Sequence, residues 1–93
     1  MKLKVFSIYD SKTECFMNPW YARTTGEAVR SFEQSIIDPN TSFHKYPDDF
    51  TLFDIGSWDD ETGEILLNEA KVNIGLAREF FREDNKPDSV RTA

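Results

Sequence analysis

The sequence predicts an α+β fold, in which a ββαββ antiparallel sheet is covered on one face by a helix and followed by a short C-terminal helix. Three observations support this prediction. Two pairs of segments rich in β-branched and aromatic residues flank one amphipathic segment. A short polar turn joins the members of each pair, as in a β-hairpin. The 93 residues suffice for one modest core, which eight Phe, three Tyr and two Trp make rich in aromatic rings.

The first hairpin is expected over residues 3–22. Residues 3–10 predict a strand, because β-branched and aromatic side chains suit a pleated surface. A polar turn follows at 11–13, and residues 14–22 predict a second strand. Pro19 cannot donate a hydrogen bond to a ladder, so this strand is expected at a sheet edge or with a bulge.

The central helix is expected over residues 25–37. Thr24 and Glu27 have the spacing of a capping box, in which each side chain accepts a hydrogen bond from the other's backbone. Asp38-Pro39 ends the helix, since a residue before proline is disfavoured in helical conformation. The apolar residues at helical spacing predict the buried face: Ala28, Val29, Phe32 and Ile36.

The segment 39–49 is predicted as an ordered loop, with Phe43 and Tyr46 folding back onto the core. A third strand is expected over 50–58. The turn at 59–63 leads into a fourth strand over 64–70, and Gly63 supplies the positive φ that such a turn needs.

The C-terminal part predicts a short helix and a tail. Residues 72–82 place Val72, Leu76 and Phe80 at helical spacing, although Gly75 weakens that helix. We therefore expect a single domain over 1–82 and a mobile polar tail over 83–93.

The composition favours a cytoplasmic protein without membrane contact. No segment reaches the ~20 apolar residues that span a bilayer, and the N-terminus lacks the features of a signal peptide. A lone cysteine cannot form an internal disulfide.

The charge is distributed unevenly. The net charge is −6, but residues 1–45 carry six Lys/Arg against five Asp/Glu, and residues 46–93 carry five against twelve. Phosphate binding depends on cations, so the acidic half is expected to repel DNA. The composition therefore argues against a sequence-independent DNA coat.

Candidate catalytic and metal-binding groups are few, and we expect neither an enzyme nor a cofactor. His44 lacks a neighbouring nucleophile and is interpreted as a loop histidine. Cys15 is expected to be a small buried apolar residue. The acidic run 59–64 does not match a calcium loop, because placing Gly63 sixth makes Trp58 the first ligand.

The residues suggest two kinds of binding. Strand residues are apolar on both faces, so self-association into a homo-oligomer is expected, unless the loop and C-terminal segment cover the second face. Exposed rings on a sheet also stack single-stranded bases, although core packing of the same rings is the alternative. The candidate DNA-binding residues combine two rings with cations of the near-neutral half: Trp20, Tyr21, Lys2, Lys4, Lys12, Arg23 and Arg30.

Three segments, 1–12, 26–32 and 46–53, resemble the small nonstructural protein of gokushoviruses, which are single-stranded DNA phages of the microvirus family. The likeness covers roughly residues 1–80. Its most specific part is Asp-Asp-Phe-Thr-Leu-Phe-Asp-Ile-Gly, starting at Asp48, before an acidic turn.

The resemblance implies a nonstructural protein in the cytoplasm of the infected bacterium. It further implies a DNA-binding regulator of the switch from duplex replication to synthesis of single strands for packaging. The alternative is an acidic adaptor that docks a basic phage or host replication protein without touching DNA. In that case the partner surface would be the acidic turn: Asp59, Asp60 and Glu61.

Overall fold

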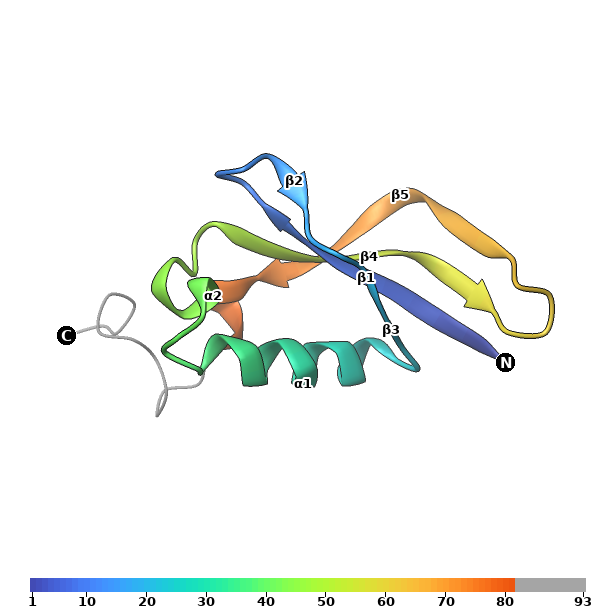
Figure 1. The fold of residues 1–93 in the computed structure, drawn as a ribbon, viewed down its shortest axis with the longest axis horizontal. Helices are drawn as coiled ribbons and strands as arrows, with labels where there is room; N and C mark the ends of the chain where they lie inside the picture. Colours follow the sequence, from blue (N-terminus) through green and yellow to red (C-terminus); the bar gives the residue numbers. More distant parts are fainter. Residues whose placement is uncertain (82–93) are drawn as a thin grey trace.

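The computed structural model describes residues 1–81, in which a five-stranded antiparallel sheet carries one long helix on one face (Figure 1). The predicted α+β class is confirmed. Along the chain the elements are β1 Lys2–Asp10, β2 Cys15–Phe16, β3 Trp20–Ala22, α1 Thr25–Ile36, α2 Ser42–Lys45, β4 Phe50–Asp59, β5 Ile65–Leu76 and the 3₁₀ helix η1 Ala77–Phe80. The predicted tail over 83–93 lies outside the described residues.

The sheet has β1 and β4 at its centre and β5 at one edge. β2 and β3 pair one after the other with the second edge of β1. The single strand expected over 14–22 is thus wrong, because the residues around Pro19 separate it into two short strands. Its edge position was predicted correctly. Cys15, expected to be buried, is exposed at this edge.

α1 begins at the predicted cap, but only half of the capping box forms. Thr24 Oγ1 accepts a hydrogen bond from the Glu27 backbone N–H at 3.1 Å. The Glu27 carboxylate accepts instead from the Arg23 backbone N–H, one residue before the cap, at 3.2 Å. The predicted N-cap at Thr24 is therefore confirmed, but the predicted return bond from the Thr24 backbone to Glu27 is replaced by the bond from Arg23.

The core lies between α1 and the sheet. Phe6 and Leu52 from the two central strands meet Phe32 and Ile36 from α1, and all four side chains are almost completely buried. The segment expected to be a loop contains α2, which brings Phe43 into edge-on contact with Phe32, their ring centroids 5.3 Å apart.

Tyr46 was also expected to fold back onto the core, but its side chain is 59% exposed, so this prediction is wrong. Among residues 1–81, no helix is long and apolar enough to cross a membrane.

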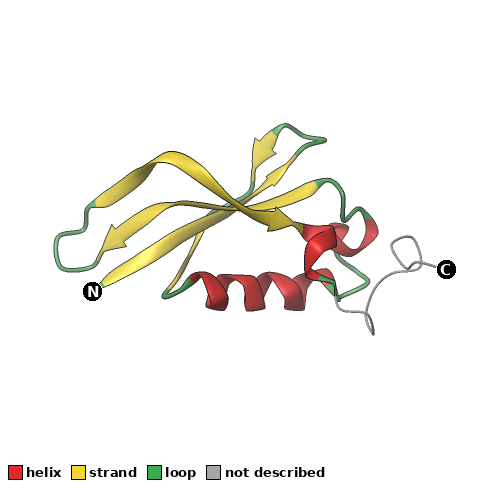
Figure 2. Cartoon of the chain, turned by 180° about the vertical axis from the view of Figure 1, so that it is seen from behind, coloured by secondary structure: helices red, strands yellow, loops and turns green. Residues whose placement is uncertain are grey.

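β5 differs most from the prediction. The expected helix over 72–82 is wrong: the strand continues to Leu76 through pairs such as Asp54↔Val72, and only η1 follows. The β4–β5 hairpin extends well past the start of α1 (Figure 2). Its turn has the expected glycine, Gly63, with a φ of 76°.

The middle of β5 leaves the ladder with β4. The pairs Gly56↔Leu67 and Asp54↔Val72 place four residues of β5 opposite the single residue Ile55. We call residues 68–71 the arch, which curves away from β4 (Figure 1). Asn68 anchors it, because its side-chain amide donates to both the backbone and the side-chain oxygen of Asp54, each at 3.1 Å.

Candidate functional site

The sheet face opposite α1 carries a row of aromatic side chains, and we call it the open face. Paired residues in an antiparallel ladder point to the same side, and Phe6 points towards α1. Because strand residues alternate between faces, the residues on both sides of Phe6 in β1, and every second residue beyond them, point to the open face. Their partners on the adjacent strands point to the same face. The rings collected there are Tyr9, Phe16, Tyr21, Phe53 and Trp58.

These rings form two clusters. Phe16 lies 4.9 Å from Tyr9 and 5.6 Å from Phe53, measured between ring centroids. Tyr21 lies 5.4 Å from Trp58. Phe16 is 42% and Tyr21 50% exposed, so each cluster presents at least one ring to solvent. Such an arrangement offers flat apolar surfaces to a stacking ligand.

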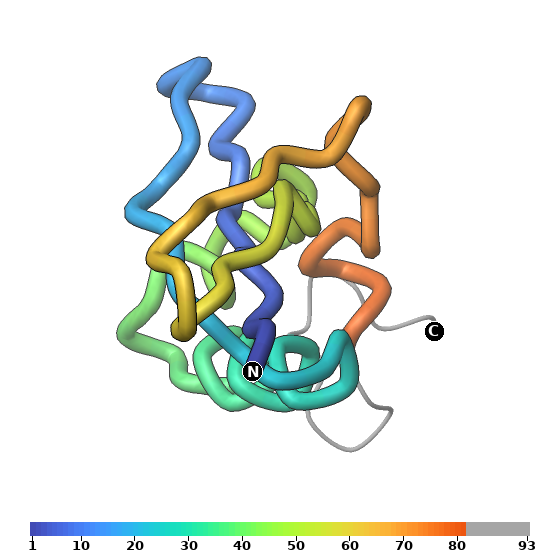
Figure 3. The backbone as a smooth tube through the Cα atoms, turned by 90° about the vertical axis from the view of Figure 1, so that its right-hand side faces the viewer, coloured from blue at the N-terminus to red at the C-terminus, as the bar shows by residue number. Residues whose placement is uncertain are grey.

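A cation accompanies the first cluster. Seen end on, the turn after β1 and the middle of β5 both rise away from α1, on the two sides of the sheet (Figure 3). Lys71, in the arch, holds its Nζ 5.6 Å from the centroid of the Phe16 ring. This cation–π contact places a positive charge over the open face, close to exposed rings. Lys71 is not among the predicted DNA-binding residues, because the sequence predicts position 71 to lie between a strand and a helix.

The predicted pair of stacking rings is divided between the two faces. Tyr21 pairs with Val5 and lies on the open face. Trp20 points to the other face, where its ring centroid lies 6.0 Å from that of Phe6. Adjacent strand residues alternate between faces, so the two rings cannot stack on one strand of bases side by side.

Trp20 instead lines a pocket of about 510 Å³ beside α1. The other lining residues are the apolar Ile8, Met17 and Phe32 and the polar Asn18, Ser31 and Ser35.

The predicted cations do not form one patch. Lys4 pairs with the nearly buried Asp54, Nζ to Oδ2 at 3.2 Å, and Arg23 pairs with Glu27 at 3.5 Å. Lys12 lies in the turn after β1, and Arg30 lies exposed on α1. Lys2 lies opposite Asp59 in the backbone register of β1 and β4.

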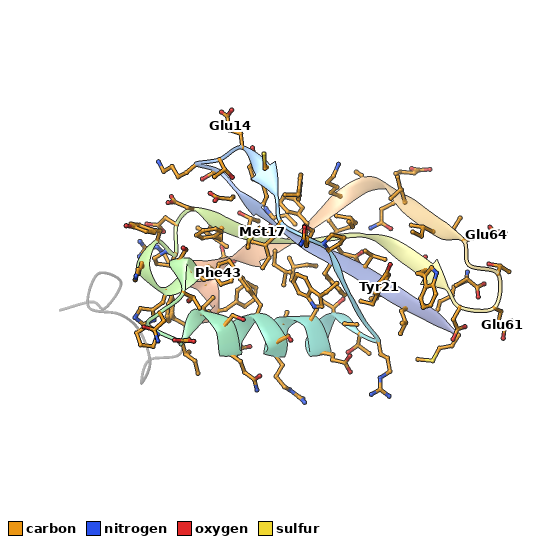
Figure 4. The ribbon with its side chains drawn as sticks, in the orientation of Figure 1. Glu14, Met17, Tyr21, Phe43, Glu61 and Glu64 are labelled. Carbon is orange, nitrogen blue, oxygen red and sulfur yellow. The ribbon has the colours of Figure 1, made fainter. Side chains whose placement is uncertain are left out.

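The acidic turn is partly neutralised by the chain's own amino group. The Met1 ammonium lies 2.7 Å from Asp60 and 3.7 Å from Glu61. The hydrogen bond to Asp60 raises the pKa of this ammonium. Asp59 is engaged in the turn, where its carboxylate accepts from the Glu61 backbone N–H at 2.9 Å. Glu61 and Glu64 lie near the tip of the β4–β5 hairpin and point outward from it (Figure 4). Glu14 lies far from them, near β2.

His44 has a structural partner. Its Nδ1 lies 2.9 Å from the Ile36 carbonyl oxygen, which can only accept, so Nδ1 donates at the end of α1. The ring also meets Phe81 edge-on, with centroids 5.9 Å apart. His44 is a half-buried residue of α2, and its hydrogen bond to Ile36 connects α2 to the end of α1. Within residues 1–81, no three His, Cys, Asp or Glu side chains gather as metal ligands would.

The comparison with known proteins gives a family. No curated protein and no solved structure matches the chain. The family model described as Phage ORF5 protein matches residues 3–80, which include every described strand and helix except for Lys2, the first residue of β1. The chain therefore belongs to the Phage ORF5 protein family and is a phage protein.

Proposed function

We propose that this phage protein regulates DNA replication in the infected cell by binding single-stranded DNA across its open face. The observation that carries the proposal is the pair of aromatic clusters on the sheet face that α1 leaves uncovered. A ring that stacks on an unpaired base contributes about 1–3 kcal/mol, and the contact tolerates any base sequence. A duplex hides its base faces, so single strands are favoured.

The charge of the protein limits how this binding works. Its net charge of −6 opposes a polyanion, and Lys71 is the cation that accompanies the rings. Stacking therefore supplies most of the affinity, and few phosphates are neutralised. Each phosphate contact to a single strand contributes roughly 0.7 to the slope of log affinity against log salt, so a shallow slope is expected.

The biological role that fits such binding is the switch from duplex replication to synthesis of single strands for packaging. The resemblance to gokushovirus nonstructural proteins supports this finer assignment, and it implies action in the host cytoplasm. A protein that covers newly made single strands weakly and without sequence preference diverts them from conversion back to duplex.

The experiment is a titration of labelled oligothymidine and of its duplex over a range of salt. Tyr21→Ala should weaken single-strand binding about 5- to 150-fold, as expected for the loss of one stacked base. Tyr46→Ala is the matched control, because Tyr46 is also a largely exposed tyrosine but lies in the segment between α2 and β4. Equal loss in both variants, or equal affinity for duplex, contradicts the proposal.

A second titration tests which cations contact the phosphates of the DNA. Lys71→Ala should weaken binding and flatten the salt slope, whereas Lys45→Ala, at an exposed cation on α2, should not. Arg30 lies on α1, which covers the other face of the sheet. Loss of binding in Arg30→Ala with full binding in Lys71→Ala would move the interface to the helix side.

The adaptor remains the second candidate, and the hairpin tip favours it. Glu61 and Glu64 are exposed there and project from the end of the sheet (Figure 4). An adaptor would show no shift with single-stranded DNA at moderate salt. It would bind the purified phage replication initiator, and Glu61→Gln with Glu64→Gln would abolish that binding.

A further inference from the structure

The outer edge of β5 is long, exposed and apolar. β5 has twelve residues and ends the described sheet on one side. At its start, Ile65 is 57%, Leu66 49% and Leu67 77% exposed, so apolar side chains point to solvent on both faces. A strand edge of this kind pairs readily with another chain, and proteins usually protect it with proline, with repeated charges or with a bulge, of which the arch is an example. β5 contains no proline and only two charged residues.

Those two charges are arranged symmetrically. Glu69 and Lys71 flank Ala70, which lies near the middle of β5. If a second β5 pairs antiparallel about a two-fold axis at Ala70, Glu69 of each chain faces Lys71 of the other. The same register places Leu66 opposite Ile74 and uses the full strand. A two-fold axis at Glu69 would instead place two carboxylates opposite each other, which is unfavourable.

We infer that a second copy of this chain pairs with the edge of β5, antiparallel and centred on Ala70, to form a symmetric dimer with one continuous sheet. The two-fold axis of such a pairing runs perpendicular to the sheet. Both open faces therefore lie on one side of the dimer, and both α1 helices lie on the other. The dimer joins two sets of aromatic rings into one surface.

The arch makes the two charged positions easy to test. Residues 68–71 have no partner residue on β4, so substitutions at 69 and 71 leave the internal ladder unchanged. The dimer is measured without DNA, and its presence does not depend on DNA binding. A failure of this inference and a failure of the proposed function are thus separate results.

The experiment is sedimentation velocity of the full chain from low to high micromolar concentration. The unmodified chain should form a dimer. Glu69→Lys and Lys71→Glu each put like charges opposite each other twice, so each should weaken the dimer about tenfold or more. The double variant, which exchanges the two charges, should restore dimerisation. Circular dichroism of each variant checks that the fold is intact.

Mixing the two single variants gives the sharpest result. In a mixed pair, both cross-chain contacts become attractive again, so the heterodimer should form at concentrations at which each variant alone is mostly monomeric. A monomeric unmodified chain at high micromolar concentration overturns the inference. A loss in Lys71→Glu without a loss in Glu69→Lys also overturns it, since the inferred register places both residues in the same two cross-chain contacts. The rescue in the double variant excludes an effect of the lost Lys71–Phe16 contact.

Discussion

Gly56 lies in β4 at a point where β5 approaches too closely for any side chain. A Cβ atom added there would lie 2.4 Å from the Leu66 carbonyl oxygen and 3.2 Å from Leu67 Cα. Contacts under 3.0 Å essentially never occur for Cβ, so Gly56→Ala must displace the β5 backbone by more than half an ångström. Because backbone atoms rather than a flexible side chain oppose the methyl group, the strain has no easy release.

Overpacking of this kind costs about 1–3 kcal/mol. In a domain of this size each kcal/mol lowers the melting temperature by roughly 4–8 °C. Urea unfolding and thermal melting, both followed by circular dichroism, measure the loss.

Gly26→Ala is the matched control, because the same substitution in the first turn of α1 meets only Thr24 Oγ1, at 3.9 Å. Alanine is the better helix former there, so Gly26→Ala should be neutral or stabilise by up to ~1 kcal/mol. Equal stability of Gly56→Ala and the unmodified protein would refute the close packing of β5 on β4.

Three further predictions concern the helix, the core and the C-terminal contact. Thr24→Ala and Glu27→Ala should each lower the free energy of unfolding by about 0.5–2 kcal/mol, measured by urea unfolding, and unchanged stability would mean that α1 begins elsewhere. Phe32→Ala should cost about 3–5 kcal/mol, because the ring is almost fully buried and the surrounding rings cannot close the cavity; a loss below 1 kcal/mol would contradict this packing. Arg78 donates a paired hydrogen bond to Asp48, and this contact lowers the pKa of Asp48. The contribution of this ion pair to stability is therefore complete above the ordinary pKa of 3.8 and is lost as the pH falls through the lowered pKa. The difference in melting temperature between the unmodified protein and Arg78→Met should shrink in acid. A difference that grew in acid would contradict the pairing.

The parts of the fold that depend on residues close together in the sequence could be predicted from it. The N-cap at Thr24 and the apolar face around Phe32 depend on neighbours within a few residues, so α1 could be predicted. Gly63 identified the hairpin turn in the same way. The C-terminal part of β5 was missed because Val72, Leu76 and Phe80 fit a helical spacing as well as a strand. Its pairing with β4 decided the conformation, and that contact is distant in sequence.

The candidate site was harder to predict than the fold. The sequence predicts Tyr21 and Trp20 together as exposed rings, but the alternation of strand residues leaves only Tyr21 on the open face and turns Trp20 to the other face. The position of Lys71 over Phe16 joins the two opposite sides of the sheet. No local pattern reports such a contact, since it depends on the order of the strands and on the arch.

The arch also affects how this sheet tolerates changes in chain length. Ladder pairing resumes on both sides of residues 68–71, at Leu67 and at Val72, with Asn68 fixing the near end on Asp54. An inserted or deleted residue in an ordinary strand turns every later side chain to the wrong face. Within the arch, the extra or missing residue is taken up by the part of β5 that does not pair with β4, and the β4–β5 pairs beyond it keep their partners. Relatives of this chain should therefore differ in length at this point of β5 more readily than anywhere in β1 or β4.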